Sequence, residues 1–184
     1  MRAYLKIYRK AILILLGVLA VLGFLTYSFI SPYGMFSDLQ NDLKTIEPEE
    51  GAEYTDLDGN PVDLATFKGK PLIVNAWATW IPFSQTELPL LIQAKETYGD
   101  EITILAINRM EETIRIRSFL STFAISENTI LFLTDPTDYF YRVTGGYAMP
   151  ERIFYRPDGT IEMHKRGVLT KEELSATIDT LLAR

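Results

Sequence analysis

A short apolar run that leads directly into a proline-containing turn restricts the possible folds more than any other part of this sequence. Residues 71–77 read Pro-Leu-Ile-Val-Asn-Ala-Trp, the nearly continuous apolar pattern of a strand that is buried on both faces. The turn contains Pro82, and we expect a helix from there to about Tyr98, ended by Gly99. A buried strand followed at once by a helix is typical of a parallel or mixed sheet with helices packed on it.

The alternation of strand and helix patterns continues toward the C-terminus. The predicted elements are a hairpin over 53–64, strands at 102–107 and 129–133, a helix at 112–123 and a short helical turn at 135–143. Two further strands, 151–155 and 160–165, are joined by a turn with proline and glycine in suitable places. A capping box at 170–173 then opens a last helix. This order predicts an α/β three-layer sandwich with a mixed central sheet.

The N-terminal part predicts a membrane anchor. Residues 11–30 are almost entirely apolar, and twenty residues span roughly 30 Å of hydrocarbon as a helix. Residues 1–10 are basic, which predicts a cytoplasmic N-terminus and an extracytoplasmic remainder at the cytoplasmic membrane. A cleaved signal peptide is the alternative, but bulky residues at 25–30 favour an uncleaved anchor. Residues 31–51 are then a linker, and 52–184 form the folded domain.

The charge and residue usage of the chain exclude several functions. Residues 31–184 hold 14 basic and 24 acidic side chains, a net charge of −10, which disfavours binding to nucleic acid. The chain has one histidine, His164, and no cysteine, so only scattered carboxylates are left as metal ligands. We therefore expect no metal site, no cofactor and no lipid anchor on a cysteine.

Four segments together resemble one known family. They are the block Trp77-Ala78-Thr79-Trp80 with Pro82 and Glu87-Leu88-Pro89, the opening 58–62 with 68–71, the segment 147–151 and the hairpin 156–159. This set resembles the membrane-anchored, TlpA/ResA-like thiol-disulfide oxidoreductases of the thioredoxin superfamily, which are related to the redoxins and to AhpC/TSA. The resemblance spans about residues 52–182 and implies a thioredoxin-like fold.

The same resemblance implies a redox pair that this chain lacks. Relatives of this kind use a low-pKa thiolate at the helix start and a second thiol three residues later. The corresponding positions here are Ile81 and Ser84, so disulfide exchange by this site is impossible. Ser84 fits either a capping box with Glu87 or an ordinary early-helix position, and no base is expected beside it. We expect His164 to be an exposed strand residue.

The resemblance also implies a peptide-binding groove. In similar proteins the proline that corresponds to Pro150 is cis, faces the redox motif and leaves the preceding backbone free to pair with an extended peptide. The groove residues would be Trp80, Ile81, Pro82, Phe83, Met149 and Pro150. Two arrangements are open: the aromatic side chains are exposed in the groove, or Trp80 and Phe83 pack on Tyr147 and close it.

The sequence therefore favours a tethered, redox-inactive module that binds a protein or peptide partner in the cell envelope. One alternative is a member of a thiol-disulfide pathway whose chemistry a partner supplies, because fold alone does not carry a reaction. The other is a structural scaffold that contacts membrane proteins through acidic faces, for example at Glu172 and Glu173 of the last helix.

Overall fold

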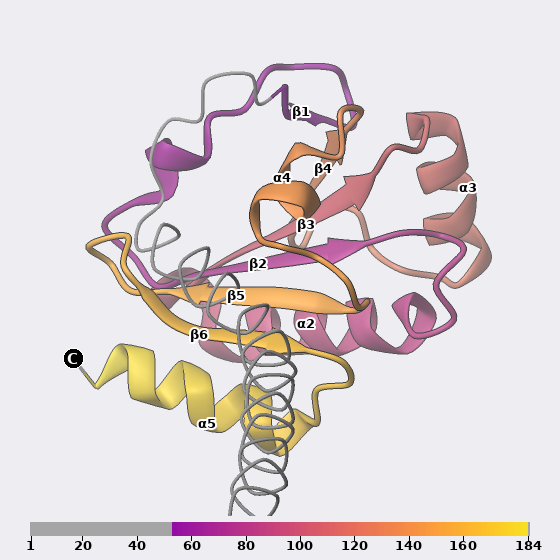
Figure 1. Cartoon of the computed structure of the whole chain (residues 1–184). Coiled ribbons are helices and arrows are strands. Elements are labelled where there is room, and N and C mark those ends of the chain that lie inside the picture. The colour runs from indigo at the N-terminus through magenta and orange to yellow at the C-terminus, as the bar shows by residue number, and fades with distance from the viewer. Residues whose placement is uncertain (1–52, 184) are drawn as a thin grey trace, which may run out of the picture. The chain divides into compact units, whose positions relative to one another are not determined.

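The computed structural model describes residues 53–183, all of which fall in one compact unit (Figure 1). A single mixed sheet of six strands forms its centre, in the order β1-β4-β3-β2-β5-β6. The strands are β1 (Thr55–Asp56), β2 (Leu72–Trp77), β3 (Thr103–Arg109), β4 (Leu131–Asp135), β5 (Glu151–Tyr155) and β6 (Ile161–Arg166). Strands β2, β3 and β4 are parallel, whereas β1, β5 and β6 each pair antiparallel to their neighbours.

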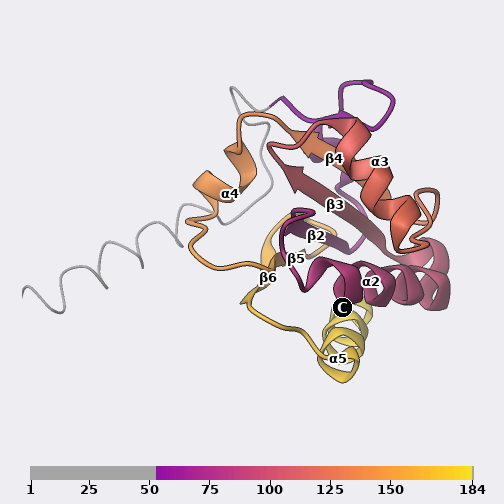
Figure 2. The ribbon, with the colours of Figure 1, turned by 90° about the vertical axis from the view of Figure 1, so that its right-hand side faces the viewer.

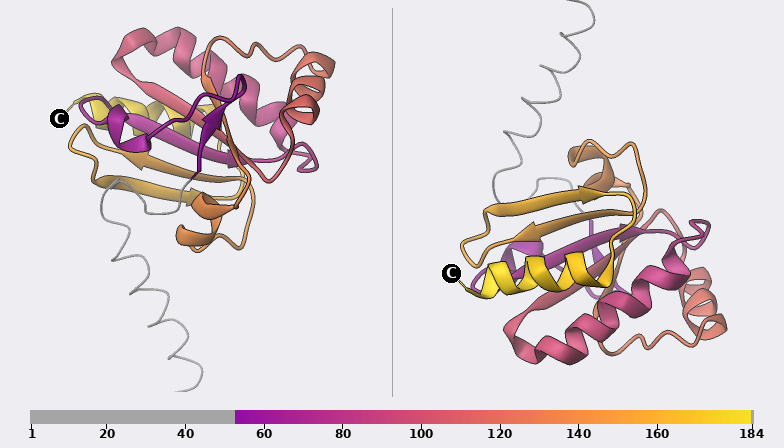
Figure 3. Two further views of the ribbon diagram at one scale, coloured as in Figure 1. Left: turned by 90° about the horizontal axis from the view of Figure 1, so that it is seen from above. Right: turned by 90° about the horizontal axis from the view of Figure 1, so that it is seen from below.

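Helices cover both faces of this sheet. They are the 3₁₀ turns η1 (Leu64–Phe67) and η2 (Gly99–Glu101) and the helices α2 (Ser84–Tyr98), α3 (Thr113–Thr122), α4 (Tyr139–Val143) and α5 (Lys171–Leu182). Figure 3 shows α2 and α5 lying across the same side of the sheet. Buried residues of α2, α3 and α5 share one apolar core with that face, while η1 and α4 contribute to a second core on the other face. The predicted three-layer α/β sandwich with a mixed sheet is confirmed.

The local signals in the sequence explain most element boundaries. All six residues of β2 are buried, as its continuous apolar pattern predicts. Gly99 has a φ of 54° and ends α2, because glycine enters the left-handed region without a steric penalty. The Thr170 side chain accepts a hydrogen bond from Glu173 N, and Glu173 returns one to Thr170 N, which is the predicted capping box of α5.

The predicted N-terminal hairpin is present in reduced form. Strand β1 meets Pro61 through one isolated bridge and pairs mainly with β4 at the edge of the sheet. Pro61 has no N–H and cannot continue a ladder, which explains the short pairing. The turn itself is fixed by the Asp56 carboxylate, which accepts hydrogen bonds from the backbone N–H groups of Asp58 and Asn60.

The predicted cytoplasmic segment 1–10, the transmembrane segment 11–30 and the linker 31–51 lie outside the described residues. Among the helices between residues 53 and 183, none combines the length and the apolar character that a membrane crossing requires.

Candidate functional site

The connection between β2 and α2 holds the two positions at which the family resemblance places thiols. Ala78 O accepts hydrogen bonds from Ile81 N (3.1 Å) and from the hydroxyl of Ser84 (2.8 Å), and Ser84 N donates to Ile81 O (3.0 Å). Ile81 is half-buried, whereas Ser84 is only 2% exposed and is the first residue of α2. The helix cap is Phe83, so the capping-box alternative for Ser84 is wrong and the early-helix alternative is correct.

Glu111, in the connection between β3 and α3, holds this loop in place. Its carboxylate accepts hydrogen bonds from the backbone N–H (2.7 Å) and the hydroxyl (2.6 Å) of Thr79. The same carboxylate accepts a hydrogen bond from the side-chain amide of Asn108 and pairs with Arg115 at 3.0 Å. The loops that follow β2 and β3 are therefore joined at the end of the sheet where these two parallel strands finish (Figure 2).

Large apolar side chains are exposed at this end of the sheet. Trp80 is 56% exposed, Phe83 48% and Tyr147 74%, so the two loop aromatics do not close over the site by packing on Tyr147. Seven large apolar side chains are exposed within residues 53–183, and six of them belong to the connections at this end of the sheet or to the first turn of α3. Those six are Trp80, Phe83, Met110, Ile114, Tyr147 and Val168. These exposed apolar side chains are therefore concentrated toward one end of the sheet and are not spread evenly over the surface.

The segment before β5 completes the site. Glu151, the first residue of β5, pairs with Ala76 of β2, so Met149 and Pro150 lie beside the end of β2. The bond between them is cis, as the resemblance implies. Pro150 O accepts a hydrogen bond from Gly167 N (2.8 Å), but Ala148 and Met149 make no backbone hydrogen bond to any residue between 53 and 183. Pro150 itself is buried, and Met149 is half-buried. We call the predicted set Trp80, Ile81, Pro82, Phe83, Met149 and Pro150 the motif surface.

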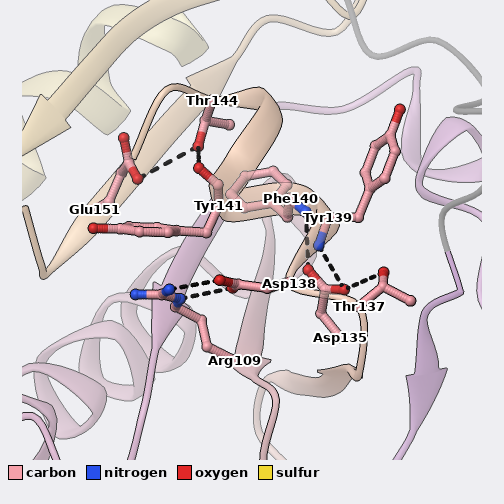
Figure 4. A network of polar contacts seen from close by, with 9 residues as sticks. All are labelled: Arg109, Asp135, Thr137, Asp138, Tyr139, Phe140, Tyr141, Thr144 and Glu151. Atoms are coloured by element: carbon pink, nitrogen blue, oxygen red, sulfur yellow. Dashed lines mark hydrogen bonds and ion pairs between the residues drawn. The ribbon is translucent and has the colours of Figure 1, made fainter. Parts of the chain in front are cut away.

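A polar network between the end of β3 and α4 supports this end of the sheet (Figure 4). Asp138 accepts two hydrogen bonds from Arg109, at 2.7 and 2.6 Å, and the Arg109 guanidinium lies 3.4 Å from the centre of the Tyr141 ring and 5.8 Å from that of Trp80. Burial alone would lower the pKa of Arg109, but the hydrogen bonds and charge of Asp138, with smaller effects of Tyr141 and Glu151, together outweigh it and the pKa is raised. Burial also raises the pKa of the Tyr141 phenol, and the charge of Arg109 offsets this only in part.

The N-terminus of α4 is fixed within the same network. The buried Asp135 carboxylate accepts hydrogen bonds from the backbone N–H groups of Tyr139 (2.9 Å) and Phe140 (2.8 Å) (Figure 4). These are two of the donors that a helix N-terminus leaves without intrahelical partners. The backbone just before Tyr141, whose ring covers Arg109, is thereby anchored.

A second cluster lies behind Pro150. Glu151 is fully buried, and its carboxylate lies 2.6 Å from His164 Nε2 and accepts a hydrogen bond from Arg166 Nε at 2.9 Å. The hydroxyl of Thr144 donates to the other carboxylate oxygen. The expectation that His164 is exposed is wrong: only 8% of its side chain is accessible, because β6 packs its charged residues against Glu151. His164 is thus engaged with Glu151, and Ser84 with Ala78, so no serine–histidine pair forms.

A third buried pair lies under α2. Arg152 is fully buried and its guanidinium forms an ion pair with Glu87, while also donating to Gly167 O at 3.0 Å. Burial raises the pKa of Glu87, and the opposing effect of Arg152 is smaller. Asn75 is also buried, and neither atom of its side-chain amide has a partner within the described part of the chain.

Sequence reasoning brought together the residues of the motif surface but missed those that support it. Arg109, Glu111, Glu151 and Arg152 are buried or half-buried charges, and in the sequence they look like ordinary polar residues of strands and loops. The one available signal is a charged pair, Glu151-Arg152, at the start of the otherwise apolar predicted strand 151–155, since charges that become buried require partners.

The described residues of the site supply neither a thiol nor a group of metal-ligating side chains. The chain contains no cysteine, and in the span 53–183 no three histidine or acidic side chains gather where they could share a metal ion. Fold and site together define a thioredoxin-like domain whose two exchange positions hold Ile81 and a buried, hydrogen-bonded Ser84.

Comparison with known proteins assigns the chain to a family. The model of the family described as Redoxin matches residues 40–181, and the chain belongs to that family. It is 24% identical over 164 residues to the thiol-disulfide oxidoreductase ResA of Bacillus cereus, with 89% of this chain and 90% of the relative covered. It is 26% identical over 147 residues to the soluble secreted antigen MPT53 of Mycobacterium tuberculosis, with 78% and 83% covered.

Solved structures show the same fold. A secreted Mycobacterium tuberculosis disulfide oxidoreductase homologous to Escherichia coli DsbE superposes with a TM-score of 0.61 at 26% identity, covering 71% of this chain and 95% of that one. A putative thiol:disulfide interchange protein DsbE from Chlorobium tepidum gives a TM-score of 0.66 at 21% identity, covering 76% and 97%. The predicted resemblance to the redoxins is confirmed.

Proposed function

We propose that this protein is a redox-inactive redoxin that binds an extended segment of a partner protein at the motif surface. The observation that carries the proposal is that two features meet at the end of the sheet where β2 finishes and β5 begins. Exposed apolar side chains, led by Trp80, Phe83 and Tyr147, lie beside a backbone segment, Ala148–Met149, that has no backbone partner among the described residues. An extended peptide can pair with such a backbone and place alternate side chains on the apolar patch.

The hydrogen bonds that hold the motif surface favour a rigid binding site over a former active site without any function. Glu111 fixes the loop that carries Trp80, and Gly167 fixes Pro150. A site that is held in position before binding loses less conformational entropy when a partner binds. ResA is named a thiol-disulfide oxidoreductase; at the equivalent site of this chain only noncovalent recognition is left, because no thiol is present to form a mixed disulfide.

We place this activity outside the cytoplasmic membrane. The apolar segment 11–30 preceded by a basic segment supports a single membrane anchor with the domain on the outer side. The relative MPT53 is described as a soluble secreted antigen, which agrees with an exported domain. The partner would then be a protein of the cell envelope.

Site-specific photocrosslinking tests the binding proposal. A photoreactive residue replaces Phe83 in the full chain in intact cells, and a matched control replaces Thr180, which is exposed on α5. We expect a discrete protein to be captured from position 83 only, and to be lost when Tyr147→Ser is added, since Tyr147 is exposed and its replacement spares the core. Capture from position 180 alone, or equal capture from both, would contradict binding at the motif surface.

A further inference from the structure

Met110 has an unusual backbone conformation for its residue type. Its φ is 56°, in the left-handed region that residues other than glycine, asparagine and aspartate rarely adopt. Its side chain is 64% exposed, whereas the other two methionines between residues 53 and 183, Met149 and Met163, are half-buried against the two cores. An exposed, strained residue of this kind persists only where its surroundings fix it, and such residues cluster at functional sites.

The surroundings of Met110 fix it firmly. Its own N–H donates to Asp135 O at 3.1 Å. The residue before it, Arg109, is paired with Asp138, and the residue after it, Glu111, accepts two hydrogen bonds from Thr79. Both neighbours of Met110 are therefore anchored, and the thioether is presented to solvent at a defined place.

That place adjoins the motif surface. Arg109 stacks near the Trp80 ring, and Glu111 holds Thr79, so the backbone of Met110 lies between two residues that contact the loop between β2 and α2. An exposed methionine is a flexible and polarizable contact that is common at peptide-binding surfaces. Oxidation of its sulfur turns this apolar contact into a polar one.

We propose that Met110 is a selective oxidation site, and that its sulfoxide weakens partner binding at the motif surface. The second half of this proposal rests on the proposed binding function. The oxidant is a peroxide: the sulfur lone pair attacks one peroxide oxygen, the O–O bond breaks, and the proton on the transferred oxygen passes to the leaving oxygen. With hydrogen peroxide the products are methionine sulfoxide and water, the sulfur losing two electrons and the peroxide gaining two. In a chain without cysteine, Met110 is the most exposed sulfur of the described range.

The first test measures the site of oxidation. The full chain is treated with hydrogen peroxide, and the gain of one oxygen atom at each methionine is followed by peptide mass spectrometry. Because reactivity follows exposure, Met110 should react about tenfold faster than Met163. Equal rates at Met110, Met149 and Met163 would overturn the proposed selectivity. This readout requires no partner, so it judges the oxidation site even if the binding proposal fails.

The second test measures the effect on binding. The photocrosslinking yield from position 83 is compared before and after peroxide treatment, with Met110→Leu as the matched variant that keeps the apolar volume but cannot be oxidised. We expect the yield at limiting partner to fall about tenfold in the native chain and to stay unchanged in Met110→Leu. An equal fall in both, or no fall in either, would overturn regulation through Met110. Absence of capture before any oxidation would instead refute the binding function itself and, with it, the regulatory half.

Discussion

The ion pair between Glu87 and Arg152 permits a sharp test of how the site is supported. Arg152 is fully buried, and its guanidinium links α2 to Gly167, whose N–H in turn holds Pro150. We consider two perturbations: Glu87→Gln, which removes one charge and keeps the shape, and Glu87→Leu with Arg152→Met, which replaces the pair by apolar side chains of similar volume.

The magnitudes follow from the burial of the two groups. Glu87→Gln leaves a guanidinium with no accessible surface and only neutral oxygen acceptors, and an uncompensated buried charge costs about 3–5 kcal/mol. The raised pKa of Glu87 shows that burial of its charge costs more than Arg152 returns. The double apolar variant should therefore lie within about 1 kcal/mol of the native protein, or be more stable.

Urea unfolding of a fragment covering residues 43–184, the compact unit, measures these free energies at pH 7.5. A double-mutant cycle with Glu87→Leu alone and Arg152→Met alone as the two single variants then isolates the interaction between the two side chains. The reasoning is refuted if Glu87→Gln loses less than about 1 kcal/mol, or if the double variant loses as much as the two single variants added together, because either result means that the charges are solvated in the folded state.

Three further predictions concern the same domain. The pKa of Glu87 is raised above its ordinary 4.5 in the folded state, so the free energy of unfolding should fall as the pH rises through the range above 4.5; urea titrations at several pH values should show a shallower fall in Glu87→Gln. Ile81→Cys with Ser84→Cys should create a disulfide-exchange site, since the first thiol would be half-exposed just before a helix and the second buried. The double variant should catalyse the reduction of insulin by dithiothreitol, whereas each single variant should not. Failure of the double variant to form an intramolecular disulfide would contradict the geometry. Gly146→Ala would place a Cβ 2.4 Å from the Tyr141 ring and should lower stability by about 1–3 kcal/mol, whereas an unchanged melting temperature would mean that the ring moves freely.

The predictions that succeeded rest on local patterns. The strand 72–77, the glycine that ends α2, the hairpin at 156–159 and the capping box of α5 are each encoded in a few consecutive residues. Their signals are periodicity, turn chemistry and capping, which act over about one to four residues and are therefore readable in the chain itself.

The predictions that failed concern side chains whose surroundings come from distant segments. His164 is predicted to be exposed, yet its side chain is almost fully covered because Glu151, 13 residues away, faces it from the neighbouring strand. For Ser84 the sequence leaves a capping-box and an early-helix position open, and only the structure decides for the second, with the hydroxyl donating to Ala78 O. No local pattern distinguishes these outcomes, because burial of one side chain depends on which elements pack against it.

The sequence by itself determined the fold family and the loss of disulfide exchange, because both depend on which residues occupy known positions: a buried strand, a proline turn, and Ile81 and Ser84 where thiols would stand. The tertiary structure alone decided that Trp80 and Phe83 are exposed and that Met110 stands beside them in a left-handed conformation. It also decided that Arg152 meets Glu87, 65 residues away. Exposure and ion pairing arise from the packing of remote elements, and a one-dimensional pattern does not contain that packing.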